Sequence, residues 1–200
     1  MKIIIVGASG KIGREICNRL EADHDVVEVG RTSGDIQCDY TDAGSVEAMY
    51  SRTGAFDGLI CVAGNDVRFG DYDELTDDDY AYGFERKFLG QVRLLKLGVP
   101  HANDNANFIF SSGFLTHYPN RFSIATGPLN AAVDAFAHNV APLLPRNIRV
   151  NVVSPAPIVP EERAGHGLIS AAQAAEQYVE TLMGQDSGRV TRAWGGLEGE

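Results

Sequence analysis

Three glycines at a regular spacing form the first candidate site in the chain. The segment GASGKIG places Gly7, Gly10 and Gly13 directly after the apolar run 2–6 and at the start of a helical pattern. Without a β-carbon, glycine lets a phosphate approach the N-terminus of a helix, where free amides and the helix dipole favour negative charge. A tight turn without a ligand explains one of these glycines well but three of them poorly. The loop therefore predicts dinucleotide binding, with Gly7, Ser9, Gly10, Lys11, Ile12 and Gly13 as contacts.

The end of the second expected strand bears on which dinucleotide is bound. NAD sites usually carry a carboxylate there, which receives the ribose hydroxyls. Here Gly30 stands at that place and Arg31 follows it. A guanidinium suits a 2′-phosphate through charge-assisted hydrogen bonds, and Thr32 and Ser33 could add hydroxyl donors. These residues favour NADP(H). Glu28, inside the strand, is the competing ribose ligand, and a plain surface charge is the alternative for Arg31.

The elements that position these residues follow from the hydrophobic pattern. Strands are expected at 2–6, 25–29, 58–64, 107–112, 148–154 and 188–194, and helices at 11–22, 82–98, 126–141 and 171–183. The strand runs are nearly continuously apolar, which is typical of strands covered on both faces. The alternation predicts an α/β fold with a Rossmann-type, doubly wound parallel sheet in three α/β/α layers. Residues 1–200 are expected to form a single domain, with 160–187 as a substrate lid.

Composition narrows the partners. A net charge of −10 over 200 residues argues against nucleic acid and anionic membranes. The apolar start of the chain is interrupted at Gly7, too early for a signal peptide or a membrane span. Cys17, Cys38 and Cys61 show neither metal-ligand spacing nor a disulfide framework. These features predict a cytoplasmic protein with no nucleic-acid partner, no membrane partner and no metal.

Several segments together resemble the short-chain dehydrogenase/reductase family. They are the glycine loop, GR after the second strand, CDYTD (38–42), CVAG (61–64), SSG (111–113) and IRVNVVSPAPI (148–158). The resemblance runs from Met1 to about Trp194, and the glycine spacing is similar to that of the family's extended or atypical variants. It implies a homodimer or homotetramer, in which the helices at 82–98 and 126–141 form the dimer interface.

The resemblance also assigns contacts with the cofactor. It implies that Asp39 contacts the adenine amino group and that the backbone of Ala63 and Gly64 passes beside the adenosine ribose. It further implies that the turn after the sixth strand cradles the nicotinamide, with Pro155 and Ile158 as contacts. Ala156 stands where the family usually has glycine, which makes this last assignment less direct.

The family's catalytic set is Asn, Ser, Tyr and Lys, with the last two spaced Tyr-x-x-x-Lys. Tyrosine exchanges a proton with the substrate oxygen, lysine binds the nicotinamide ribose and lowers the tyrosine pKa, and serine polarises the carbonyl. Alignment back from IRVNVVSP, with a one-residue gap, places Thr126 at the tyrosine position and Asn130 at the lysine position. Ser112, or else Ser111, stands at the serine position, and Lys87 stands at the asparagine position.

The missing pair leaves the proton source open. Lys87 could titrate or organise a proton relay if burial lowers its pKa, and Asn130 could still bond the ribose. His117 and Tyr118 lie in the loop after the serine, where a side chain could fold over the nicotinamide. The alternatives are structural: Lys87 on a solvated helix face, and Thr126 as the cap of a helix.

The leading hypothesis is therefore an NADP(H)-dependent oxidoreductase of the short-chain type. It would act on a small carbonyl or alcohol and use Ser112, Lys87, Asn130 and Thr126 in place of the usual set. A dinucleotide-binding sensor or regulator without turnover is the competing hypothesis, which the missing pair favours. Isomerase or epimerase activity is a third, since similar glycine loops occur in sugar-nucleotide enzymes of the family.

Overall fold

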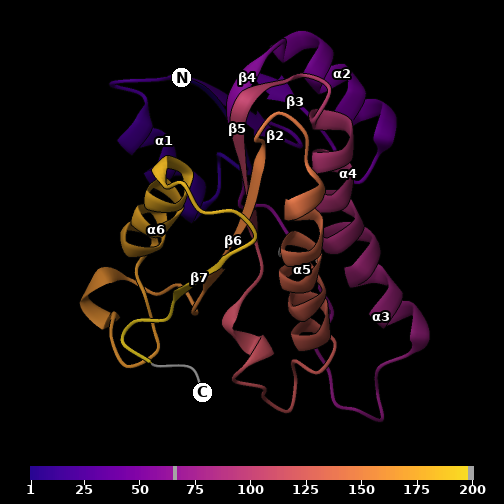
Figure 1. The fold of residues 1–200 in the computed structure, drawn as a ribbon. Helices are drawn as coiled ribbons and strands as arrows, with labels where there is room; N and C mark the ends of the chain where they lie inside the picture. The colour runs from indigo at the N-terminus through magenta and orange to yellow at the C-terminus, as the bar shows by residue number, and fades with distance from the viewer. Residues whose placement is uncertain (65–66, 198–200) are drawn as a thin grey trace.

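A sheet of parallel strands forms the middle layer of the protein (Figure 1). The computed structural model describes residues 1–64 and 67–197. The strands are β1 (Lys2–Val6), β2 (Asp25–Gly30), β3 (Ile36–Gln37), β4 (Phe56–Cys61), β5 (Ala102–Ser111), β6 (Arg149–Pro155) and β7 (Val190–Ala193). They lie in the order β3-β2-β1-β4-β5-β6-β7, and every neighbouring pair is parallel. The doubly wound parallel sheet predicted from the sequence is confirmed.

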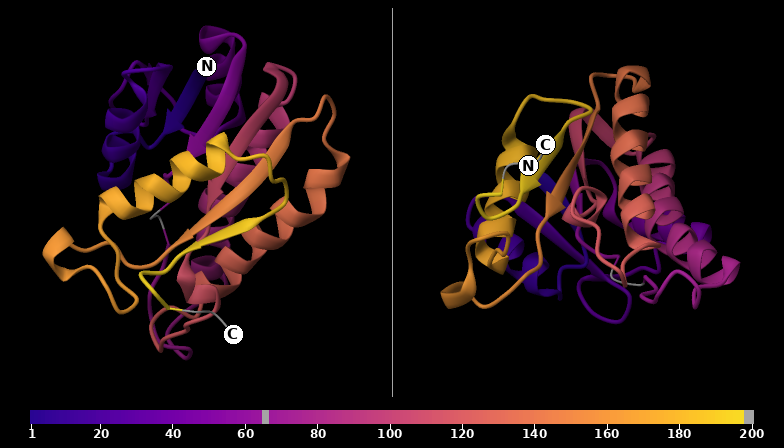
Figure 2. Two further views of the ribbon diagram at one scale, coloured as in Figure 1. Left: turned by 60° about the vertical axis from the view of Figure 1, so that its left-hand side comes forward. Right: turned by 90° about the horizontal axis from the view of Figure 1, so that it is seen from below.

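Helices cover both faces of this sheet, as Figure 2 shows. The main helices are α1 (Lys11–Leu20), α2 (Ala43–Thr53), α3 (Asp77–Gly83), α4 (Leu89–Gly98), α5 (Thr126–Val140) and α6 (Ala171–Met183). The short ones are η1 (Phe84–Phe88), η2 (Phe114–Thr116), η3 (Ala141–Leu143) and η4 (Glu161–Arg163). Buried residues of α1 and α6 share one core cluster, and those of α2, α4 and α5 share the other. The three-layer α/β/α arrangement is confirmed.

The alternation of side chains along β1 shows how one apolar run serves both cores. Ile3 and Ile5 belong to the core under α1 and α6, whereas Ile4 and Val6 belong to the core on the opposite face. All four are buried, as is expected for a strand covered on both sides. The direction of winding reverses at β1, which has β2 on one side and β4 on the other. Such a reversal opens a crevice at the carboxyl ends of the strands, where ligands of these folds bind.

Most of the predicted elements are present, and α6 and the final strand lie where the sequence placed them. The sequence pattern did not identify α2 or the two-residue strand β3. The helix predicted at 82–98 is the later part of a continuous α3–η1–α4 run, interrupted by the π-helical turn η1. Among the described residues, no helix is long and apolar enough to cross a bilayer.

The lid expected over 160–187 is contradicted for the helical part of that segment. Residues Ala171–Met183 form α6, whose buried side chains Ala174, Tyr178 and Leu182 pack in the core that α6 shares with α1. The helix is therefore a layer of the fold. Its amphipathic spacing reflects packing against the sheet and not closure over a pocket.

Candidate active site

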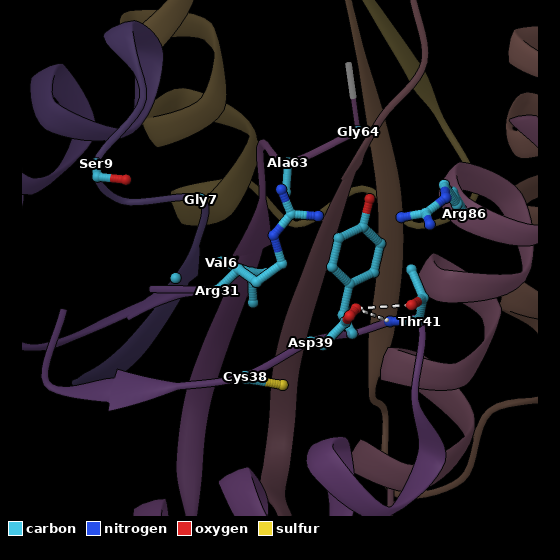
Figure 3. A pocket seen from close by; sticks show the side chains of 12 residues that line it. Val6, Gly7, Ser9, Arg31, Cys38, Asp39, Thr41, Ala63, Gly64 and Arg86 are labelled. Atoms are coloured by element: carbon cyan, nitrogen blue, oxygen red, sulfur yellow. Dashed lines mark hydrogen bonds between the residues drawn. The ribbon is translucent and has the colours of Figure 1, made fainter. Parts of the chain in front are cut away.

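A cavity of about 220 Å³ opens beside the ends of β1, β2 and β4 (Figure 3). Its lining residues are Val6, Gly7, Ser9, Gly30, Arg31, Cys38, Asp39, Tyr40, Thr41, Ala63, Gly64 and Arg86. Figure 3 shows Arg31 and Arg86 on opposite sides of this space, with Asp39 and Thr41 between them along the floor. Thr41 donates to Asp39 Oδ1 from its hydroxyl at 2.7 Å and from its amide at 3.0 Å. These bonds lower the pKa of Asp39, and both guanidinium groups act in the same direction.

The turn after β2 explains why no carboxylate stands at its tip. A β-carbon on Gly30 would lie 2.7 Å from the Ser33 carbonyl oxygen, so any larger residue would push the turn away. The competing residue, Glu28, does not line the cavity. Burial, and then the Glu28 carboxylate, raise the pKa of the Cys17 thiol on α1 to about 11, which places Glu28 near that helix. Among the residues that line this cavity, Arg31 and Arg86 are therefore the cationic groups for the ribose end of a nucleotide, and the Asp39 carboxylate lies beside them.

The glycine loop fits a phosphate at the start of α1. Gly7 has a φ of +94°, and a β-carbon there would lie 2.8 Å from the Ala63 amide. A β-carbon on Gly13 would lie 2.2 Å from the Gly7 carbonyl oxygen, so close packing alone requires glycine at both positions. Gly10 is different: it precedes the helix, and no side chain caps the helix there. A β-carbon on Gly10 would lie 3.3 Å from the Gly7 carbonyl oxygen. The first-turn amides of α1 are thus available to a ligand.

A second cavity, of about 550 Å³, continues from the first, and Gly64 lines both. Its other lining residues are Gly10, Lys11, Ile12, Gly13, Val62, Val67, Lys87, Ser112, Gly113, Phe114, Leu115, Thr126, Asn130, Pro155, Ala156, Pro157 and Ile158. The structure therefore brings the four expected catalytic residues together with the expected nicotinamide contacts, Pro155 and Ile158. The two cavities together run from the arginines, past the glycine loop, to the turn after β6.

Lys87 is the best-defined polar group of the second cavity. It lies in η1, and only 7% of its surface is exposed. Its Nζ donates to the Ser112 carbonyl oxygen at 2.8 Å and to Asn130 Oδ1 at 2.8 Å. Asn130 in turn donates to the Gly113 carbonyl oxygen at 3.3 Å. Burial lowers the pKa of Lys87 from 10.5 to about 8, while the nearby Asp134 carboxylate opposes this change. The interpretation of Lys87 as part of a solvated helix face is therefore wrong.

Two hydroxyl groups of the cavity have unusual surroundings. Ser112 Oγ and Thr126 Oγ1 are shielded from solvent. Among the described residues, neither oxygen has a partner that satisfies both the distance and the angles of a hydrogen bond. Thr126 is the first residue of α5, which follows Ala125 and has no side-chain cap. Thr126 as a helix cap is therefore also wrong, because its hydroxyl does not bond the free amides. Each hydroxyl would meet a ligand in the cavity only after a rotation about its Cα–Cβ bond.

Some expected residues do not join the site. Thr32 and Ser33 are exposed and are not among the lining residues of the first cavity. His117 is exposed and packs on Trp194, with ring centroids 5.1 Å apart. Tyr118 stacks on Phe114, so neither side chain folds over the second cavity.

Other site residues were missed by sequence reasoning. Tyr40 and Thr41 line the first cavity and follow Asp39 directly, so their position after a strand was a usable signal. Arg86 also lines it, and its basic neighbour Lys87 was the only hint in the sequence.

Comparisons with known proteins agree with this geometry. A family model described as enoyl-(acyl carrier protein) reductase matches residues 2–189. A protein of Listeria innocua with a crystal structure is 31% identical, with a TM-score of 0.90 over 97% of this chain and 100% of that one. A small-chain dehydrogenase in complex with NADPH is 25% identical, with a TM-score of 0.88 over 98% and 97%. An uncharacterised oxidoreductase of Methylorubrum extorquens is 27% identical over 91% of this chain and 83% of its own.

The chain belongs to the short-chain dehydrogenase/reductase family. It is accordingly an oxidoreductase of the short-chain type. Members of this family use NAD(P) and act on small molecules.

Proposed function

We propose that this protein is an NADP(H)-dependent oxidoreductase that acts on a small carbonyl or alcohol with an exchanged lysine–asparagine pair. The observation that carries the proposal is the bond of 2.8 Å between Lys87 Nζ and Asn130 Oδ1 beside the second cavity. Family resemblance puts asparagine at position 87 and lysine at position 130. Here each residue stands at the other's position, and an ammonium–amide contact joins the two.

The exchange preserves the chemistry that the site needs. An ammonium enclosed at the cavity favours negative charge on a substrate oxygen, and it does so most strongly where water is excluded. Asn130 accepts a hydrogen bond from this ammonium, and its own side chain is oriented by the hydrogen bond that it donates to the Gly113 carbonyl oxygen. A bound nicotinamide would supply or accept the hydride. Ser112 would polarise the carbonyl, and Thr126 would offer its unpaired hydroxyl to the substrate or the ribose.

The first cavity supports a cofactor with a 2′-phosphate. Arg31 and Arg86 flank it, and the tip of β2 has no room for the acid that binds a ribose with two free hydroxyls. Arginine binds phosphate through two parallel bonds, and two arginines would tighten that contact. The relative crystallised with NADPH has the same fold and is consistent with this choice. Thr32 and Ser33, which are exposed and directly follow Arg31 in the sequence, stay predicted phosphate contacts.

The substrate is proposed to be small. The second cavity, of about 550 Å³, must receive both the nicotinamide half of the cofactor and the substrate. Few polar groups beyond Lys87, Ser112, Thr126 and Asn130 face it, and Phe114 and Leu115 supply apolar walls. The homodimer or homotetramer implied by the resemblance stays a prediction, which light scattering of the purified protein would measure.

Calorimetric titration with NADPH and then NADH tests the cofactor, and oxidation of NADPH with a panel of small aldehydes, ketones and quinones tests turnover. Lys87→Ala should abolish turnover and leave NADPH affinity nearly unchanged, because the ammonium lies at the substrate end of the site. Lys96→Ala is the matched control, since Lys96 is an exposed lysine on the following helix α4. Normal turnover by Lys87→Ala would refute the catalytic role.

A sensor without turnover is the second candidate, because the Tyr-x-x-x-Lys pair is absent. A sensor should bind NADPH tightly yet oxidise it with none of the carbonyl compounds. In a sensor, Ser112→Ala should leave NADPH binding unchanged, whereas in an enzyme the same substitution should lower the rate of carbonyl reduction.

A further inference from the structure

Gln91, near the start of α4, carries a buried amide that bonds the backbone beside the candidate site. Only 1% of its surface is exposed, and it is not among the described lining residues of either cavity. Its Oε1 accepts a hydrogen bond of 2.8 Å from the Ser111 amide, and its Nε2 donates to the Ser111 carbonyl oxygen at 3.2 Å. The same Nε2 donates to the Lys87 carbonyl oxygen at 3.3 Å. One side chain therefore joins the π-helical turn η1 to the end of β5.

The way β5 ends explains why a side-chain amide is needed at this place. Ser112 donates its amide hydrogen to the Val153 carbonyl oxygen of β6 at 3.1 Å. Because successive residues of a strand direct their backbone groups to opposite sides, Ser111 faces the side of β4, and β4 ends at Cys61. A buried amide and a buried carbonyl without partners are costly. Gln91 offers one acceptor and one donor, as a neighbouring strand would.

Ser111 is itself held in place by the core. Its Oγ donates to the Cys61 carbonyl oxygen at 2.6 Å and lies within hydrogen-bond distance, also 2.6 Å, of the Tyr178 hydroxyl of α6. All three residues are buried. The backbone of Ser111 is therefore a fixed point where β4, β5 and α6 meet, and Gln91 attaches η1 to this point.

Lys87 is the residue whose position depends on this attachment. Its stem passes beside Gly64, where a β-carbon would lie 3.1 Å from Lys87 Cγ. Its Nζ lies 2.8 Å from both of its acceptors, the Ser112 carbonyl oxygen and Asn130 Oδ1. A lysine stem is long and flexible, so the place that its ammonium reaches depends on where its backbone is held. Gln91 holds that backbone against β5, one residue before the Ser112 carbonyl that the ammonium bonds.

We propose that Gln91 is a positioning residue that holds Lys87 where its ammonium can stabilise a substrate oxygen; this inference rests on the proposed function. Gln91 acts through the Lys87 backbone and not through contact with cofactor or substrate. A displacement of about 1 Å at a reacting group can lower a rate by about 10²-fold. Loss of the Gln91 amide should therefore lower kcat and leave KM and the NADPH affinity nearly unchanged.

The test compares two full-length variants that each remove a buried amide without changing the size of the side chain much. Gln91→Met loses three hydrogen bonds near the site. Asn107→Leu is the matched control, because Asn107 on β5 is also 1% exposed, lies outside the described lining of both cavities, and makes three hydrogen bonds, with Thr181, Leu182 and Asn151. With NADPH and an active carbonyl compound, kcat should fall by about 10²-fold in Gln91→Met and stay near the wild-type value in Asn107→Leu.

The titration of Lys87 gives a second measurement, which needs no substrate. NMR of protein labelled at the lysine Cε carbons should show one signal for each of the four lysines, and Lys87→Met identifies the signal of Lys87. Its midpoint in the wild type should lie at about 8, with Cys61 of β4 and Asp134 of α5 as the ionisable groups that face it. Gln91→Met should move this midpoint towards 10.5, because the displaced ammonium meets water in the second cavity. Asn107→Leu should leave the midpoint unchanged.

Gln91→Asn provides a further variant that keeps an amide, and it replaces Gln91→Met if that protein does not fold. Its side chain is one methylene shorter and cannot reach both η1 and β5, so its kcat and its Lys87 midpoint should lie between those of the wild type and Gln91→Met. Values of kcat and of the midpoint that match those of Asn107→Leu would overturn the positioning role and leave the proposed function standing. A wild-type protein that binds NADPH but reduces no carbonyl would overturn the proposed function and, with it, this role of Gln91.

Discussion

Replacing Lys87 by methionine should change how the stability of the protein depends on pH. Methionine fills a similar volume but carries no charge, so Lys87→Met removes one titration from the folded core. In the folded protein burial lowers the pKa of Lys87 from 10.5 to about 8. Below pH 8 the lysine is charged in both the folded and the unfolded state, and folding includes the cost of burying that charge.

The sign and size of the effect follow from linkage. Between pH 8 and 10.5 the unfolded chain holds a proton on Lys87 that the folded protein has released, so the free energy of unfolding rises with pH over this window. At about 1.4 kcal/mol per pH unit, the whole interval from about 8 to 10.5 corresponds to about 3 kcal/mol. Moving from pH 7 to pH 9.5 should relieve about 2 kcal/mol of it.

Urea unfolding of both proteins at pH 7 and pH 9.5 measures this effect as a double difference. Between the two pH values, the wild type should gain about 2 kcal/mol relative to Lys87→Met. Other titrating groups cancel because both proteins contain them. Cys61, which interacts with Lys87, stays neutral because burial raises its pKa to about 12. A double difference below about 0.5 kcal/mol would show that Lys87 titrates as if exposed, and the argument for an enclosed ammonium would fail.

Three further results are expected. Arg31→Ala should weaken NADPH binding by about 2 kcal/mol, or roughly 30-fold, and NADH binding much less; calorimetry showing equal losses would remove the 2′-phosphate argument. Gly13→Ala should lower the free energy of unfolding by about 2 kcal/mol or more in denaturant titrations, because its β-carbon would lie 2.2 Å from a carbonyl oxygen. Thr126→Tyr with Asn130→Lys would place two ammonium groups together, so this double variant should be less stable than the triple variant with Lys87→Asn. Only the triple variant should gain general carbonyl reductase activity in an NADPH-oxidation assay.

The sequence was sufficient for the sheet because its signal is local. Apolar runs such as 2–6 and 148–154 are long enough to show that both faces are buried, and the glycine loop between 7 and 13 identifies the strand that stands beside the crevice. The helix α2 was missed although Val46, Met49, Tyr50 and Thr53 are buried at helical spacing. Its glycine and serine near the start obscured that pattern, and β3 is too short to carry any period.

The missed parts of the site depend on contacts that sequence spacing does not contain. The π-helical turn η1 shifts the register between α3 and α4, so a helical projection of 82–98 cannot tell which of Arg86 and Lys87 faces which cavity. Arg86 lines the first cavity, and Lys87 lines the second. Nor does spacing reveal that position 30 requires glycine. The Ser33 carbonyl oxygen leaves no room there for a β-carbon, and that contact arises from the conformation of the turn.

The buried ammonium is itself an argument for function. Lys87 is enclosed at a cost of about 3 kcal/mol at neutral pH, and the Ser112 carbonyl and the Asn130 amide oxygen accept hydrogen bonds from its ammonium. Asn130 gives up its amide oxygen to hold that charge, and the backbone of Gly113 holds Asn130. Each of these groups lines the second cavity. The free-energy cost of burying the ammonium therefore falls at the place where a substrate oxygen would develop negative charge. A protein that only sensed the nucleotide would have no need of an ammonium at that end of the site.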